Sequence, residues 1–287
     1  MGLTDVTSDR EQAAPAARQG HPTRQSKSGA EARSDAIEIT NVGKAFRRRL
    51  STASVEALRD VNLSIRPGQF VSFVGPSGCG KSTLLKLIGG LIEPTSGRIA
   101  IGGRDVTEPR RDIGMMFQTS VLFPWRTILE NVLLPIEIFG LDRQAATQKA
   151  LNILRLVGLE GREHAYPREL SGGMQQRAAL SRVLMTDPQI ILMDEPFGAL
   201  DEFTRERMNL ELLNVWGERG QTIIFVTHSI VEAVFLADRV VVMGTAPGRV
   251  LSVLDVPLPR PRSIELMKSP DFARIVFAVR EHLGVAR

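Results

Sequence analysis

Gly75-Pro76-Ser77-Gly78-Cys79-Gly80-Lys81-Ser82-Thr83 is the stretch from which the fold of this chain can be predicted. It fits the pattern G-x-x-x-x-G-K-[ST] of a phosphate-binding loop. Residues 70–74, directly before it, are apolar and β-prone and predict a buried strand. Residues 82–91, directly after it, predict a helix whose apolar residues are Leu84, Leu85, Leu87 and Ile88. A strand, a glycine loop and a helix form the context that this motif requires.

The chemistry of the loop follows from its residue types. Glycines let the backbone wrap closely around an anion, because a Cβ atom would block the approach. Backbone N–H groups then point at phosphate oxygens, and the helix N-terminus adds about half a positive charge. Lys81 is expected to reach the β- and γ-phosphates, and the Ser82 hydroxyl to ligate Mg²⁺. The loop by itself predicts an NTPase or a kinase.

Composition places the chain among soluble globular proteins. It has 287 residues, enough for one large or two small domains, and no internal repeat is visible. The net charge is +4, without a Lys/Arg cluster beside aromatic residues, so we expect no nucleic acid partner. The single cysteine, Cys79, excludes an internal disulfide and occupies a variable position of the loop that is expected to tolerate substitution. There is no apolar run of about 18 residues and no apolar signal-peptide core, so the protein is expected in the cytosol.

The first part of the chain predicts a tail and a small sheet. Residues 1–35 contain almost no large apolar residues and predict a disordered tail, with either a regulatory role or none. Three short segments, 37–40, 61–65 and 98–101, predict strands of an antiparallel sheet packed on the nucleotide core. Residues 127–158 predict helix with one apolar stripe, and Asp142 is a candidate N-cap.

The second part alternates strands with helix starts. Ser171 is placed to cap the helix that runs through 178–185, and two glycines follow it. The apolar run 189–195 predicts a buried strand that ends in two carboxylates facing a charged ligand, since burying them unpaired is costly. Residues 202–216 predict a helix, 222–227 a strand with His228 at its exit, and 240–243 the last core strand. Ser229 and Glu232 have the spacing of a capping box. A modest amphipathic helix is expected over 271–283.

Taken together and in this order, GPSGCGKS, Gln118, LSGGMQQR, IILMDE, GALD and His228 resemble the ATP-binding subunit of an ABC transporter. The resemblance implies an α/β fold: a P-loop NTPase (RecA-like) core with an antiparallel β subdomain and an inserted helical subdomain at about 119–185. It implies one ABC ATP-binding domain over 36–250, after the tail 1–35. Residues 251–287 would form a C-terminal extension with a short helix. LSGGMQQR argues against a nucleotide kinase.

The resemblance also implies site roles, with ATP and Mg²⁺ as cofactors. Phe46 would stack on adenine, at a position that more often holds Tyr or Trp. Residues 75–83 would hold the phosphates, with Lys81 acting in catalysis. Ser82 and Gln118 would ligate Mg²⁺ beside Asp194. Glu195 would be the general base and His228 the γ-phosphate sensor. A head-to-tail homodimer is implied, in which the signature residues contact ATP bound to the partner and Asp201 lies at the interface; these signature residues are Ser171, Gly172, Gly173 and Gln175.

Segments 117–125, 246–250 and 255–262 are similar to those of the nitrate/sulfonate/taurine/bicarbonate importer group. The single ATP-binding domain without membrane spans also resembles importers, whose permease is a separate chain. This implies import of a small solute, an aliphatic sulfonate such as taurine, or nitrate. Two transmembrane permease subunits would carry it, supplied by an extracytoplasmic binding protein, with this chain peripheral on the cytoplasmic face of the inner membrane. Phe123 and Trp125, within 119–170, are expected either at the permease contact or in the core of the helical subdomain. A soluble ABC ATPase of translation or DNA repair, and an export ATPase with a separate permease, are the alternatives.

Overall fold

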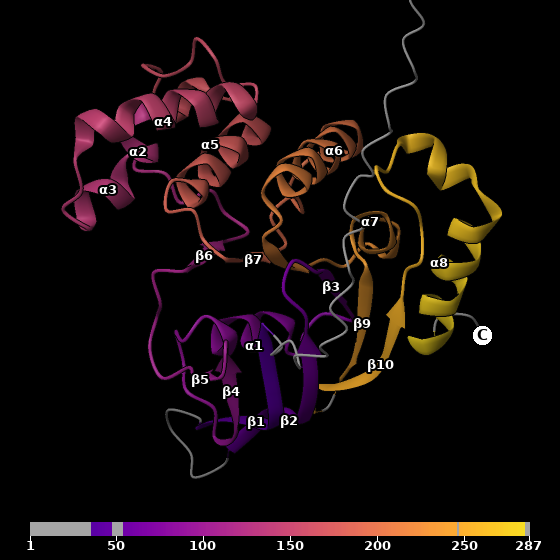
Figure 1. Ribbon diagram of the computed structural model, residues 1–287. Helices are drawn as coiled ribbons and strands as arrows, with labels where there is room; N and C mark the ends of the chain where they lie inside the picture. Colours follow the sequence, from indigo (N-terminus) through magenta and orange to yellow (C-terminus); the bar gives the residue numbers. More distant parts are fainter. Residues whose placement is uncertain (1–35, 48–53, 246, 285–287) are drawn as a thin grey trace, which may run out of the picture. The chain divides into compact units, whose positions relative to one another are not determined.

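The computed structural model describes residues 36–47, 54–245 and 247–284. The predicted disordered tail, 1–35, lies outside the described residues. The strands form two sheets, one antiparallel and one mostly parallel (Figure 1). No helix in the described ranges combines the length and apolar character needed to cross a membrane.

The antiparallel sheet has the order β2-β1-β4-β5, with β1 over Ile37–Arg47, β2 over Ser54–Ile65, β4 over Ser96–Ile101 and β5 over Arg104–Asp105. Ile37 of β1 pairs with Ile65 on one side and with Ile101 on the other. The predicted antiparallel sheet is therefore present, and β1 and β2 extend well beyond the residues expected. Phe46 lies inside β1 as a result.

The second sheet has the order β10-β9-β3-β8-β7-β6. Its parallel strands are β3 (Phe70–Val74), β6 (Ile113–Met116), β7 (Ile190–Asp194), β8 (Thr222–Val226) and β9 (Arg239–Gly244), and β10 (Arg249–Asp255) pairs antiparallel to β9. Every residue of β3 and β8 is buried, as expected where both faces of a parallel sheet are covered. Alternate residues enter two apolar clusters, one on each face: Val71 and Phe73 pack with α1 (Lys81–Ile88) and the antiparallel sheet, whereas Phe70 and Val74 pack with the later helices.

The inserted helices lie between β6 and β7 and are more divided than predicted. Instead of a continuous helical stretch over 127–158, the chain forms α2 (Ile128–Val132), α3 (Leu134–Ile138) and α4 (Arg143–Leu156), followed by a 3₁₀ turn at Pro167–Glu169 and α5 (Gly172–Leu184) (Figure 1). Pro135 in the first turn of α3 and Gly140 at φ +65° mark the breaks. Asp142 caps α4 as predicted, through hydrogen bonds from the N–H groups of Gln144 and Ala145.

The C-terminal residues complete the core. Helix α6 spans Glu202–Arg219, α7 spans Ile230–Leu236, a 3₁₀ helix covers Ile264–Lys268, and α8 spans Pro270–His282. The predicted boundary after residue 250 falls inside β10, and α8 buries Phe272, Ile275, Val276 and Val279 in the cluster shared with α7. Residues 251–284 thus pack as part of the nucleotide core. The overall fold is that of a P-loop NTPase with an antiparallel β subdomain and an inserted helical segment.

Candidate active site

The predicted catalytic residues lie together at the carboxyl-terminal ends of the parallel strands. The glycine loop follows β3, Asp194 and Glu195 end β7, and His228 follows β8. Because β3, β8 and β7 are parallel neighbours, their carboxyl ends meet at the same edge. Open α/β sheets bind ligands there.

The phosphate loop leaves the start of α1 free to bind an anion. Gly80, the N-cap of α1, has φ +91°, and no side chain caps the helix. The first N–H groups of α1 are therefore without intrahelical partners, as an anion site requires. The Lys81 ammonium lies over the loop and donates to the carbonyl oxygens of Gly75 at 2.8 Å and Pro76 at 3.2 Å. These groups fit the phosphates of a nucleotide.

Cys79 is part of the core and not an open position. Its side chain is fully buried and packs in the cluster around α1. A Cβ atom on Gly75 would lie 2.7 Å from the Cys79 sulfur, and one on Gly248 would lie 2.2 Å from the Cys79 carbonyl oxygen. The predicted tolerance of Cys79 to substitution therefore concerns a fully buried side chain, and it stays a prediction.

Ser82 and Asp194 form a pair suited to a hard cation. The Ser82 hydroxyl donates to Asp194 Oδ1 at 2.7 Å. Mg²⁺ is usually bound through one or two carboxylates plus substrate phosphates, and not by a cage of protein groups. Within the described residues there is no cluster of three His, Cys, Asp or Glu side chains that could hold a metal on its own. The pair therefore fits Mg²⁺ held jointly with nucleotide phosphates.

The Glu195 carboxylate lies close to two side chains from other parts of the chain, those of Gln118 after β6 and His228 after β8. Its Oε2 atom lies 3.5 Å from Gln118 Nε2 and 3.6 Å from His228 Nδ1. Its backbone has φ +47° and is fixed by a hydrogen bond from its N–H to the carbonyl oxygen of Val226. A non-glycine residue in this region stores strain that is common at functional sites. The carboxylate is thus oriented by the backbone of two neighbouring strands.

The start of α5, with the signature residues, packs against the start of α6, which Asp201 caps. Ser171 caps α5, with its hydroxyl accepting from the N–H of Met174, and both Ser171 and Gly172 are exposed. A Cβ atom on Gly173 would lie 2.8 Å from the Thr204 methyl group, so α5 starts against the first turn of α6. Asp201 caps that turn by accepting from the N–H of Thr204 at 3.0 Å.

Gln175, predicted to contact ATP of the partner subunit, is hydrogen-bonded within its own chain. Its amide donates to the carbonyl oxygens of Pro167 and Leu170 at 3.0 and 3.3 Å, and its Oε1 accepts from the Ser120 hydroxyl at 3.2 Å. The side chain is therefore engaged within its own chain, where it braces the turn that leads into α5. This engagement favours a structural role over contact with a partner's nucleotide.

Phe46 lies within reach of the nucleotide edge. It pairs with Val55 across the β1–β2 ladder, and β2 continues to Leu58, which packs against Gly80 of the phosphate loop. The ring is 43% exposed, and the Lys44 ammonium lies 5.2 Å from its centroid. An exposed ring at this place is available to stack on a base.

Two residues of α5 that the sequence analysis missed hold the segment after β6. Gln176, which is 5% exposed, donates to the carbonyl oxygen of Gln118 at 2.8 Å. Arg182 donates to the carbonyl oxygens of Ser120 at 3.1 Å and Val121 at 2.8 Å, and Val121 has φ +44°. Desolvation lowers the pKa of the Arg182 guanidinium. Helix α5 thus connects the signature residues with the backbone that carries Gln118.

The predicted capping box at α7 is only half formed. The Ser229 hydroxyl accepts from the N–H of Glu232 at 3.3 Å, but the Glu232 carboxylate accepts from the Thr227 hydroxyl. Burial raises the pKa of Glu232, and hydrogen bonds from Thr227 and Asn209 act in the opposite direction. The Glu232 side chain thus turns to a buried polar neighbour of His228 instead of to the helix cap.

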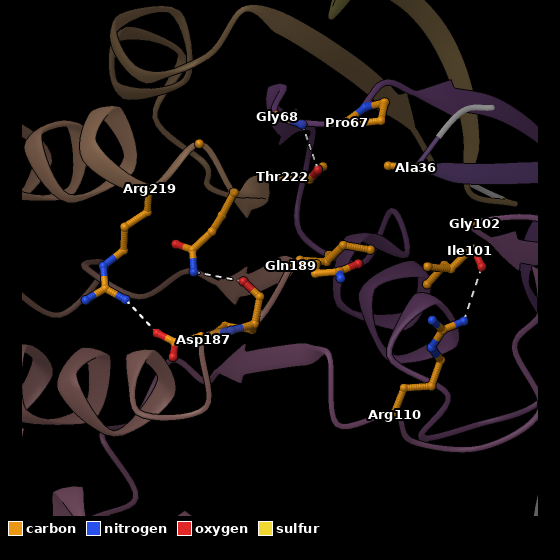
Figure 2. Close-up of a pocket in the computed structure, with 14 residues that line it drawn as sticks. Ala36, Pro67, Gly68, Ile101, Gly102, Arg110, Asp187, Gln189, Arg219 and Thr222 are labelled. Carbon is orange, nitrogen blue, oxygen red and sulfur yellow. Dashed lines mark hydrogen bonds and ion pairs between the residues drawn. The ribbon is translucent and has the colours of Figure 1, made fainter. Parts of the chain in front are cut away.

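A cavity of about 580 Å³ lies at the opposite, amino-terminal ends of the parallel strands (Figure 2). Gln189 and Thr222, at the amino ends of β7 and β8, line it together with Gly68, whose N–H donates to the Thr222 hydroxyl. None of the predicted site residues lines this cavity. It is therefore separate from the candidate active site.

The strand, glycine loop and helix, with the Ser82–Asp194 pair beside them, define a P-loop nucleotide-binding protein. The ABC transporter family model matches residues 58–198. An uncharacterised ABC transporter ATP-binding protein of Methanocaldococcus jannaschii is 45% identical over 81% of this chain and 87% of its own length. An aliphatic sulfonates import ATP-binding protein, SsuB, of Bacillus cereus is 44% identical over 79% of this chain and 88% of its own length. A solved dimeric ATP-binding cassette, in a post-hydrolysis state with ADP and Pi, has a TM-score of 0.69 at 36% identity and covers 78% of this chain and all of its own. The chain belongs to the ABC transporter ATP-binding proteins, which are ATPases.

Proposed function

We propose that this chain hydrolyses ATP in a head-to-tail homodimer and thereby powers import of an aliphatic sulfonate such as taurine, or of nitrate. The observation that carries the hydrolytic part is the convergence of Gln118 and His228 on Glu195, at the end of β7, which only β8 separates from the strand of the phosphate loop. The 44% identity with sulfonate import ATP-binding proteins supports the solute class.

In the proposed reaction, Lys81 and the first N–H groups of α1 bind the phosphates. Ser82 and Gln118 would ligate Mg²⁺, with Asp194 beside the ion, and Mg²⁺ would neutralise charge on the transferring phosphoryl group. Glu195 accepts a proton from the attacking water as the new O–P bond forms and the bond to the ADP oxygen breaks. His228 and Gln118 orient Glu195 and the γ-phosphate. The positions of these side chains around Glu195 support this division of roles.

The dimer would complete each site. Ser171 and Gly172 are exposed on their own chain, and Gly172 is the first residue of a helix whose N-terminus suits a γ-phosphate. Supplied by a second copy, they would cover ATP from the side opposite the phosphate loop and exclude water. The dimeric form of the similar cassette bound to ADP and Pi supports this arrangement.

The permease contact is proposed at the turn 123–127. Trp125 is 70% exposed and stacks on Phe123 with ring centroids 5.1 Å apart. Asn131, fully buried, holds this turn through its side chain by accepting from the Phe123 N–H and donating to the carbonyl oxygens of Phe123, Arg126 and Thr127. For Trp125, this exposure supports contact with a partner over core packing. We propose two permease subunits and an extracytoplasmic binding protein as partners, with this chain peripheral on the cytoplasmic membrane face.

The test is growth of a strain lacking this protein, with taurine or an alkanesulfonate as sole sulfur source and, separately, nitrate as sole nitrogen source. We expect growth on the sulfonate to be lost, to be restored by the wild-type chain, and not to be restored by Lys81→Ala. Unimpaired growth on all three compounds would contradict the proposed solute class. Co-purification with ribosomes or DNA instead of a permease would favour a soluble ABC ATPase.

A further inference from the structure

Phe203 is a large apolar side chain that its own chain leaves uncovered. It is 85% exposed, more than any other large apolar side chain of the described residues. It lies nine residues before Leu212, which is buried on the core side of α6. At about 100° per residue the two side chains point in opposite directions from the helix axis. The core therefore gives no reason for a phenylalanine at this position.

The surroundings of Phe203 point to what covers it. It follows Asp201, the N-cap of α6, by two residues, and it precedes Thr204. The Thr204 methyl group packs on Gly173, and the Leu200 side chain packs near Gly172. Phe203 thus lies on the first turn of the helix that supports the exposed signature residues. This turn lies beside the residues that the proposed dimer places against a second copy.

We propose that Phe203 is an apolar anchor of the ATP-bound dimer, buried against the second copy of this chain. The inference rests on the proposed function, because it needs the head-to-tail dimer to exist. A buried aromatic anchor beside polar contacts is the usual composition of an interface that binds tightly. The polar groups nearby, Ser171 and Asp201, fix the geometry around ATP, and Phe203 supplies apolar area that holds the two copies together.

The twofold symmetry of a homodimer doubles the effect of this residue. Full burial of a phenylalanine side chain contributes about 1.5–3 kcal/mol. Each closed dimer would bury two of them, and a factor of ten in affinity corresponds to about 1.4 kcal/mol. Phe203→Ala should therefore raise the dimer dissociation constant about 100-fold or more.

The experiment uses the full chain carrying Glu195→Gln, with ATP and Mg²⁺, and measures the monomer–dimer equilibrium by sedimentation over a range of protein concentrations. Phe203→Ala is introduced into this background, and Phe203→Leu, which keeps most of the apolar area, should give a smaller loss. Phe277→Ala is the matched control, because Phe277 is 58% exposed on α8 and should leave the equilibrium unchanged. ATP binding to the monomer, measured at low protein concentration, should be the same in all variants.

The outcomes separate the two proposals. A dissociation constant for Phe203→Ala within about threefold of the background would overturn the inference and leave the proposed function in place. A background variant that stays monomeric with ATP and Mg²⁺ would refute the proposed dimer, and the role of Phe203 with it. Equal losses for Phe203→Ala and Phe277→Ala would also overturn the specific role of Phe203.

Discussion

Gly248 holds the start of β10 against the phosphate loop, and Gly248→Ala should damage both the fold and nucleotide binding. The Gly248 N–H donates to the carbonyl oxygen of Ala57 at 3.1 Å, and its own carbonyl oxygen accepts from the Arg59 N–H at 2.9 Å. An added Cβ atom would lie 2.2 Å from the Cys79 carbonyl oxygen and 2.7 Å from that of Ala57. All of these obstacles are backbone atoms, so no side-chain rotation can relieve the clash.

The magnitude follows from how far the backbone must move. Carbon and oxygen atoms normally approach no closer than about 3.3 Å, so the chain has to shift by about 1 Å. Overpacking of this kind costs about 1–3 kcal/mol, and weakening the two hydrogen bonds adds about 1 kcal/mol. The free energy of unfolding should therefore fall by about 2–4 kcal/mol. Because Cys79 belongs to the phosphate loop, the shift also displaces the N–H groups that bind phosphate, and the dissociation constant for ATP should rise.

The assay combines urea denaturation with ATP-binding titration. Gly217→Ala is the control, since its Cβ would meet nothing within 4 Å inside α6, and it should stabilise the fold by about 0.5–1 kcal/mol. If Gly248→Ala kept wild-type stability and ATP affinity, the close packing of Gly248 on the phosphate loop would be refuted.

Three further changes test other parts of the structure. Arg182→Met should release the carbonyl oxygens of Ser120 and Val121, lowering the turnover rate more than ATP affinity, and a proportional loss in both would contradict a positioning role. Burial raises the pKa of Glu232, so the wild type should lose stability as this carboxyl ionises. The Glu232→Gln variant should therefore become more stable relative to wild type as the pH rises above 4.5. Parallel pH–stability curves for the two proteins would contradict the burial of an ionisable Glu232. Asn131→Ala should lower the free energy of unfolding by about 1–3 kcal/mol, because it leaves the carbonyl oxygens of the turn 123–127 without their donor. It should also weaken permease binding by more than this loss of stability explains. Wild-type thermal stability would contradict the role of Asn131.

The sequence predicted the strands, the loop and the helix caps around the phosphate loop because their signals are local. The loop 75–83, the helix caps Ser171 and Asp142, and the strand that ends at Asp194 each depend on residues a few positions apart. Their order along the chain then places them at adjacent strand ends, because neighbouring parallel strands share an edge. Strand β1 continues past Phe46, and β2 begins as early as Ser54, because the two strands pair along this length. A short apolar pattern does not predict such pairing.

Contacts between residues far apart in the chain decide the structure at the positions that could not be predicted from the sequence. Residues 249–255 form β10 because they pair antiparallel with β9, whereas residues 251–287 were expected to form a separate C-terminal extension. Cys79 is buried because it belongs to an apolar cluster that also includes residues far along the chain, such as Val241 and Met243. Glu232 turns to the Thr227 hydroxyl and not to its own helix cap. The hydrogen bonds from Gln176 and Arg182 to residues 118–121 could not be predicted from the sequence, because their acceptors are backbone carbonyl groups, which every residue carries.

An experimental structure of the Glu195→Gln chain with ATP and Mg²⁺ is the most direct measurement of how the active site is assembled. It should contain two copies and two nucleotides, each bound by Lys81 and Ser82 of one copy and by Ser171 and Gly173 of the other. Asp194 should be at the metal, and the amide introduced at position 195 should face the γ-phosphate beside His228. ATP bound by a single copy, with Ser171 open to solvent, would contradict the shared site.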